Sequence, residues 1–63
     1  MNTNTDYKNE ALSELESLKT SEDNELAHHL ADGVLIAYLR RIGHGEVADK
    51  WVETRERVGF WYA

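Results

Sequence analysis

The most apolar stretch of the chain is residues 26–42, which read LAHHLADGVLIAYLRRI. At 3.6 residues per turn its apolar side chains cover about half of the circumference of a helix. A helix this apolar needs neighbours on more than one side, so we expect it at the centre of the fold. Arg40 and Arg41 favour the carboxyl end of a helix, and Gly43 can end it in a left-handed conformation. The pattern predicts a central helix over about 22–42.

Two amphipathic helices are expected to flank the central one. The first is predicted over about 6–19, where a narrow apolar stripe has spacings of three and four residues. Its members are Tyr7, Ala11, Leu15 and Leu18. The third is predicted over about 46–58, with Trp51 on its apolar side and Gly59 at its end. The polar segment 20–25 offers Thr20 and Ser21 as hydroxyl caps for the central helix, followed by carboxylates for its first turn. This favours a break after residue 19, with one continuous helix as the alternative.

The length of 63 residues, at 7.3 kDa, predicts one small all-α domain over residues 1–63, with residues 1–5 disordered. There is no cysteine, so disulfides and thiolate chemistry are excluded. Chains this short hide apolar surface poorly, and partner chains are a common remedy. The sequence therefore predicts three helices that self-associate.

Three aromatic residues follow the last predicted helix, namely Phe60, Trp61 and Tyr62. Each would bury about 150–250 Å² when packed, so we expect this aromatic tail to lie against apolar surface. The tail can fold back across the helices, or it can dock on another subunit or a target.

The net charge and the hydropathy of the chain argue against several classes of binding partner. Twelve acidic residues against seven basic ones give a net charge of −5, which argues against non-specific binding to nucleic acid. The third helix balances its acids and bases, so a helix-turn-helix role in reading DNA is also disfavoured. No stretch approaches the ~20 apolar residues of a membrane span, and residues 1–20 lack the apolar core of a signal peptide. We expect a cytoplasmic protein with no membrane partner.

His28 and Asp32 lie four residues apart in the central helix, so their side chains share a face and can form a hydrogen bond. A carboxylate that fixes the tautomer of an imidazole is a feature of general bases and metal-bound histidines. The simpler interpretation is a structural pair at the edge of an apolar surface.

A metal site within one chain is not expected. Glu25, His28 or His29, and Asp32 would leave the coordination shell incomplete, and His44 lies too far along the helix to complete it. The sequence has no glycine-rich phosphate loop and no serine or threonine in a nucleophile motif. We therefore expect no bound metal or cofactor and no catalysis, unless subunits join to build a site around His28 and Asp32.

Residues 28–63 carry a pattern of histidine, aspartate, leucine, glycine and aromatic positions. It consists of His28-His29-Leu30-Ala31-Asp32, Leu35, Leu39, Gly43, Val47, Trp51 and the ending Trp61-Tyr62-Ala63. This pattern resembles small helical proteins encoded by tailed bacteriophages and prophages. The chain departs from it at Gly59-Phe60, where a charged residue is expected. The resemblance implies a phage or prophage origin and a role in host takeover or defence evasion, with no enzymatic activity attached.

The function predicted from the sequence is non-catalytic binding of a host macromolecule. The predicted contact residues are His28, Asp32, Trp51, Phe60, Trp61 and Tyr62. One alternative is a small-molecule or metal-dependent activity between subunits around His28 and Asp32. A second alternative is mimicry of phosphates by the acids of residues 10–25, which are Glu10, Glu14, Glu16, Glu22, Asp23 and Glu25.

Overall fold

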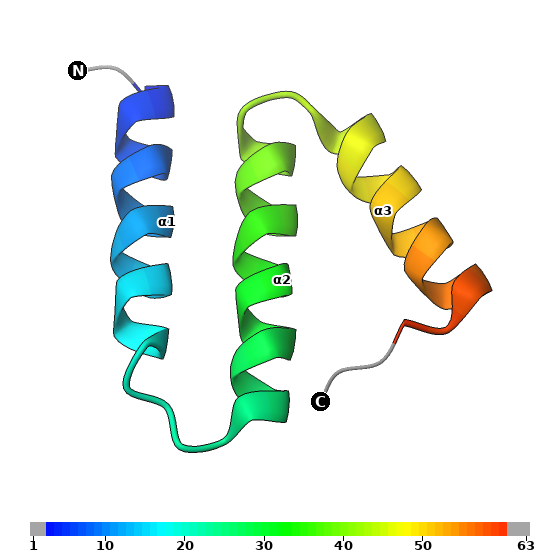
Figure 1. Cartoon of the computed structure of the whole chain (residues 1–63). Helices are drawn as coiled ribbons and strands as arrows, with labels where there is room; N and C mark the ends of the chain where they lie inside the picture. The colour runs from blue at the N-terminus through cyan, green and yellow to red at the C-terminus, as the bar shows by residue number, and fades with distance from the viewer. Residues whose placement is uncertain (1–2, 61–63) are drawn as a thin grey trace.

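The computed structural model describes residues 3–60, and these form three helices. They are α1 (Thr3–Leu18), α2 (Asn24–Arg41) and α3 (Gly45–Val58) (Figure 1). The predicted all-α class is confirmed for this part of the chain, which contains no strand. α1 begins three residues before the predicted start, because the polar residues ahead of Asp6 can also adopt helical geometry and Asp6 then lies in the first turn. Trp61 and Tyr62 of the aromatic tail lie outside the described residues.

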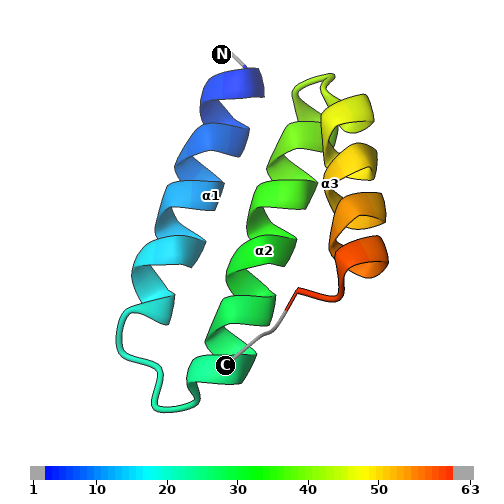
Figure 2. The ribbon, with the colours of Figure 1, turned by 45° about the vertical axis from the view of Figure 1, so that its right-hand side comes forward.

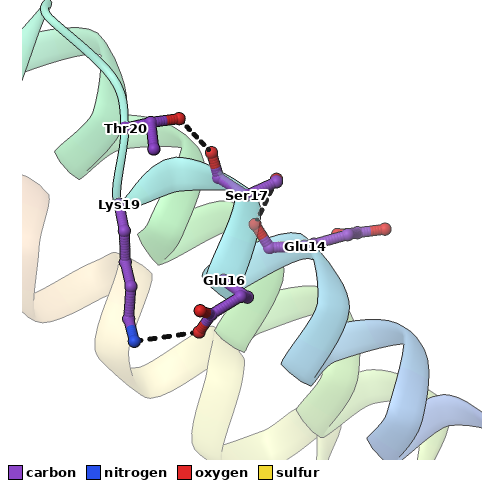
Figure 3. Close-up of polar contacts among 5 residues, drawn as sticks. All are labelled: Glu14, Glu16, Ser17, Lys19 and Thr20. Carbon is purple, nitrogen blue, oxygen red and sulfur yellow. Dashed lines mark hydrogen bonds and ion pairs between the residues drawn. The ribbon is translucent and has the colours of Figure 1, made fainter.

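The chain breaks between α1 and α2, so the alternative of one continuous helix is wrong. The carboxylate of Asp23 accepts a hydrogen bond of 2.9 Å from the backbone N–H of Leu26 and so caps α2. The hydroxyls of Thr20 and Ser21, predicted as caps of α2, serve elsewhere. Thr20 donates to the carbonyl of Ser17 at the end of α1 (Figure 3), and the Ser21 hydroxyl accepts from the N–H of Asp23 at 3.2 Å.

The end of α1 is held by short-range polar contacts (Figure 3). Ser17 donates its hydroxyl hydrogen to the carbonyl of Glu14 at 2.7 Å, and Lys19 pairs with Glu16 at 2.9 Å. Both side chains of this ion pair are largely exposed, so it contributes little to stability.

Glycines end the other two helices, as predicted. Gly43 has a φ of 91°, and the N–H of His44 donates to the carbonyl of Leu39 at 2.7 Å. The N–H of Gly43 donates to the carbonyl of Arg40 at 3.3 Å, which completes a Schellman turn after α2. Gly59, with a φ of 78°, ends α3 in the same left-handed region.

The three helices form a single layer with α2 in the middle (Figures 1 and 2). α1 and α3 both run antiparallel to α2, and within the described residues they pack on α2 and not on each other. The Cα atoms span 39 × 30 × 7 Å, so the protein is one helix thick. The central position of the most apolar helix is therefore as predicted, but no second layer covers it.

The flat arrangement leaves almost no core. Among the described residues only Ala48, at the contact between α3 and α2, is fully buried. The radius of gyration is 12.8 Å, compared with about 10.6 Å for a compact chain of this length. Apolar side chains consequently remain at the surface on both sides of the layer.

Candidate functional site

One side of the layer, here called the apolar face, carries large hydrophobic side chains from all three helices and from Phe60, two residues after the end of α3. They are between 38% and 64% exposed. The members of the apolar face are Leu12, Leu35, Val47, Trp51, Val58 and Phe60.

The other side of the layer, here called the charged face, carries the ion pairs that join the helices. Arg41 of α2 pairs with Glu10 of α1 at 3.0 Å, and Arg40 pairs with Asp49 of α3 at 2.8 Å. The hydrogen bond that Arg41 donates to Glu10, together with the negative charge of Glu10, raises the pKa of Arg41 above its ordinary value. The guanidinium of Arg41 also lies 5.5 Å from the ring centre of Tyr7, within the range of a cation–π contact.

The positions of Leu12 and Leu35 place them opposite these charges. Residues two apart in a helix differ by about 200°, so they point to nearly opposite sides. Leu12 follows Glu10 by two residues, and Leu35 follows Gly33 by two residues. Glu10 and Gly33 line the same groove on the charged face. Leu12 and Leu35 therefore project from the other side of the layer.

The rotation of about 100° per residue also places the apolar side chains of α3 opposite its charged residue on the charged face. Val47 and Trp51 stand two residues before and after Asp49, which pairs with Arg40 on the charged face. Val58 is nine residues beyond Asp49, a rotation of about 180°. Phe60 joins this group because its ring centre lies 5.3 Å from that of Trp51. Such tilted aromatic pairs are favourable beyond their buried area.

The charged face contains an open groove of about 310 Å³ between α1 and α2. Its walls include Tyr7, Glu10, Glu14 and Arg41. Glu10 and Arg41 already neutralise each other across it. The groove is therefore part of the contact between two helices, with Glu14 as a further carboxylate on its wall.

His28 and Asp32 lie close together without the predicted hydrogen bond. His28 Nε2 is 3.7 Å from Asp32 Oδ2, which is beyond hydrogen-bond distance. The helical spacing brings the two side chains to one face, but the His28 side chain is 44% exposed whereas that of Asp32 is 13% exposed. Asp32 Oδ2 is buried and accepts no hydrogen bond.

The described residues offer no cluster of three or more histidine, aspartate or glutamate side chains that could hold a metal ion. His44 lies in the connection between α2 and α3, where its side chain makes no capping hydrogen bond to α3. None of the described helices is long and apolar enough to cross a lipid bilayer.

The structure brings some of the predicted contact residues together. Trp51 and Phe60 are in contact, and His28 and Asp32 adjoin each other on α2. Trp61 and Tyr62 lie outside the described residues. Sequence reasoning missed Leu12, Leu35, Val47 and Val58 as surface residues, because it assigned apolar positions to stripes covered by neighbouring helices. Their helical rotation relative to Glu10, Gly33 and Asp49 places them on one side only once the structure has shown that these three residues lie on the charged face.

Comparison of the chain with protein-family models, with curated proteins and with solved structures finds no match. None of these comparisons bears on the resemblance of residues 28–63 to small phage proteins, which stays a prediction.

Proposed function

We propose that this protein is a non-catalytic interaction protein that binds another macromolecule through its apolar face. One observation carries the proposal: among residues 3–60, six of the eight exposed large hydrophobic side chains lie on one side of the layer, while Ala48 alone is fully buried. Contiguous exposed apolar patches rimmed by polar residues mark interaction sites in soluble proteins.

Two groups on or beside the apolar face are suited to anchor a partner. The Trp51–Phe60 pair presents rigid aromatic surface, the type of side chain that dominates binding energies at interfaces. The second group is His28, which lies seven residues before Leu35 on the same side of α2 and is 44% exposed beside the less exposed Asp32, so it offers a polar contact to a partner. Trp61 and Tyr62 follow Phe60 directly in the sequence and are proposed to extend the aromatic anchor.

The resemblance to phage and prophage proteins supports a host macromolecule as the target, within host takeover or defence evasion. A protein target is favoured over nucleic acid because the chain carries a net charge of −5. The cytoplasm of the host is then the proposed place of action.

Phosphate mimicry by the acids of residues 10–25 is less well supported than binding through the apolar face. Glu10 and Glu16 already pair with Arg41 and Lys19, and Asp23 caps α2. Half of the six acids are thus engaged in contacts within the chain.

The proposal predicts that a bacterial protein is retained by the immobilised chain and that its retention depends on Trp51. We expect Trp51→Ala to reduce retention by at least about tenfold, as for a central aromatic residue of an interface. Lys50→Ala, an exposed change on the same helix, is the matched control and should retain the wild-type amount. Quantitative mass spectrometry of the retained proteins gives the measurement. Equal retention by the two variants, or no specific retention by the wild type, would overturn the proposal.

A further inference from the structure

We propose that, when the target is absent, a second copy of this chain covers the apolar face, giving a homodimer of two stacked helical layers. This inference rests on the proposed function, because it names the second copy as the partner that binds the apolar face before the target does. A host target would then compete with the second copy for that surface.

The chain lacks the second layer that a helical domain normally has. Helices bury their apolar sides against another layer, and stable domains have at least two layers around one core. This chain supplies one layer, 7 Å thick in its Cα atoms, with Ala48 as its only fully buried described residue. An identical layer placed on the apolar face would supply the missing half of a core.

The exposed area of the chain is larger than a compact fold of this size would leave. The chain exposes 4981 Å², whereas about 4,200 Å² is expected for a compact protein of 7.3 kDa. The excess of about 800 Å² equals the share that one partner buries in a standard protein–protein interface. The flat chain therefore leaves in water an additional surface about as large as the one that a stable dimer would bury on each partner.

The placement of charge in the chain also favours stacking through the apolar faces. Two copies with a net charge of −5 each repel unless their charges are kept apart. The Arg41–Glu10 and Arg40–Asp49 pairs lie on the other side of each layer, and the Glu16–Lys19 pair, on the same side of α1 as Leu12, is neutral as a pair. Stacking through the apolar faces turns the first two pairs outward to solvent. Leu35, on the middle helix, would lie near the centre of the contact.

The test compares Leu35→Lys with Leu26→Lys by sedimentation equilibrium. The two leucines belong to α2, are 52% and 50% exposed, and lie nine residues apart, which places them on opposite sides of the helix at about 180°. Leu35→Lys should weaken dimerisation at least about tenfold, because it puts a charge at the centre of an apolar contact. Leu26→Lys should leave the dissociation constant within about threefold of the wild type, since its side chain lies outside the contact.

A second measurement covers the case in which Leu35→Lys does not fold. The melting temperature of the wild-type chain should rise between about 1 μM and about 500 μM protein, because dimerisation stabilises the folded state by mass action. A wild-type mass of 7.3 kDa at the highest concentration, or equal weakening by the two lysine variants, would overturn the homodimer. A monomer that still retains a host protein through Trp51 would leave the proposed function standing. A dimer that retains none would remove the host target and keep the homodimer.

Discussion

Gly33 and Gly43 lie ten residues apart and differ in backbone conformation. Gly33 is in the interior of α2 with ordinary helical geometry, and a Cβ there would meet nothing within 4 Å. Gly43 also has open space around it, but its φ of 91° is in the region that L-residues with a side chain avoid. Space is equal at the two positions, so only the backbone conformation distinguishes them.

We expect Gly33→Ala to raise the free energy of unfolding by about 0.5–1 kcal/mol, because alanine restricts the unfolded chain and suits a helix. Gly43→Ala should lower the free energy of unfolding by about 1–2 kcal/mol, since alanine pays a steric penalty at positive φ. Urea denaturation of both variants at one protein concentration checks the pair. Changes of the same sign would contradict the assigned turn geometry.

The environment of Asp32 differs from its sequence-based interpretation. The spacing to His28 is helical as predicted, yet the two atoms stand 3.7 Å apart. The shared helical face limits how the side chains approach, but it does not decide which of them turns inward. Here the shorter aspartate is the buried member, and its Oδ2 is without a hydrogen-bond donor.

At the level of the helices, α3 depends on a small side chain for its approach to α2. Ala48 is fully buried in this contact, and the ion pair between Arg40 and Asp49 lies beside it. The Asp49 side chain is 66% exposed, so solvent weakens that pair and apolar packing contributes more to the contact.

Ala48→Leu should therefore lower the free energy of unfolding by about 1–3 kcal/mol, as expected for overpacking a closely packed position. The matched control is Glu56→Leu, which introduces the same side chain at an exposed position of α3. It should change stability by no more than about 0.5 kcal/mol. Chemical denaturation followed by circular dichroism provides the measurement. A Glu56→Leu loss as large as that of Ala48→Leu would show that α3 is not positioned through Ala48.

For the molecule as a whole, the single layer predicts unequal stability among the helices. α2 contacts both neighbours, whereas within residues 3–60 each outer helix contacts only α2. Either outer helix can therefore open while the other stays in place, and local openings of this kind cost less than global unfolding.

Amide hydrogen exchange should give the slowest rates in the middle of α2, with faster exchange along α1 and α3. Exchange measured by NMR on the wild-type chain at fixed concentration checks this order. The carboxyl-terminal turns of the three helices serve as an internal comparison, since helix ends fray in every case. Protection in α1 equal to that in the middle of α2 would contradict a layer in which α1 has one neighbour.

Much of the helical content follows from local signals in the sequence. Gly43 and Gly59 end their helices because glycine tolerates the left-handed conformation that satisfies the last carbonyls. The apolar composition of residues 26–42 placed α2 correctly in the middle. The residue that caps α2 was less predictable, because Thr20, Ser21 and Asp23 all carry oxygens that can accept a hydrogen bond from a backbone N–H. Asp23 is the cap because the backbone places it directly before the first turn of α2.

The residues of the chain thus determined the three helices by themselves, since periodicity, caps and glycine conformations act over a few neighbouring residues. The tertiary arrangement decided which apolar side chains stay in water. Leu35 and Val34 are adjacent in one apolar helix, yet Val34 lines the groove against α1 while Leu35 remains 52% exposed. The physical reason is that burial depends on where neighbouring helices pack around α2, and two neighbours on its opposite sides leave a strip uncovered.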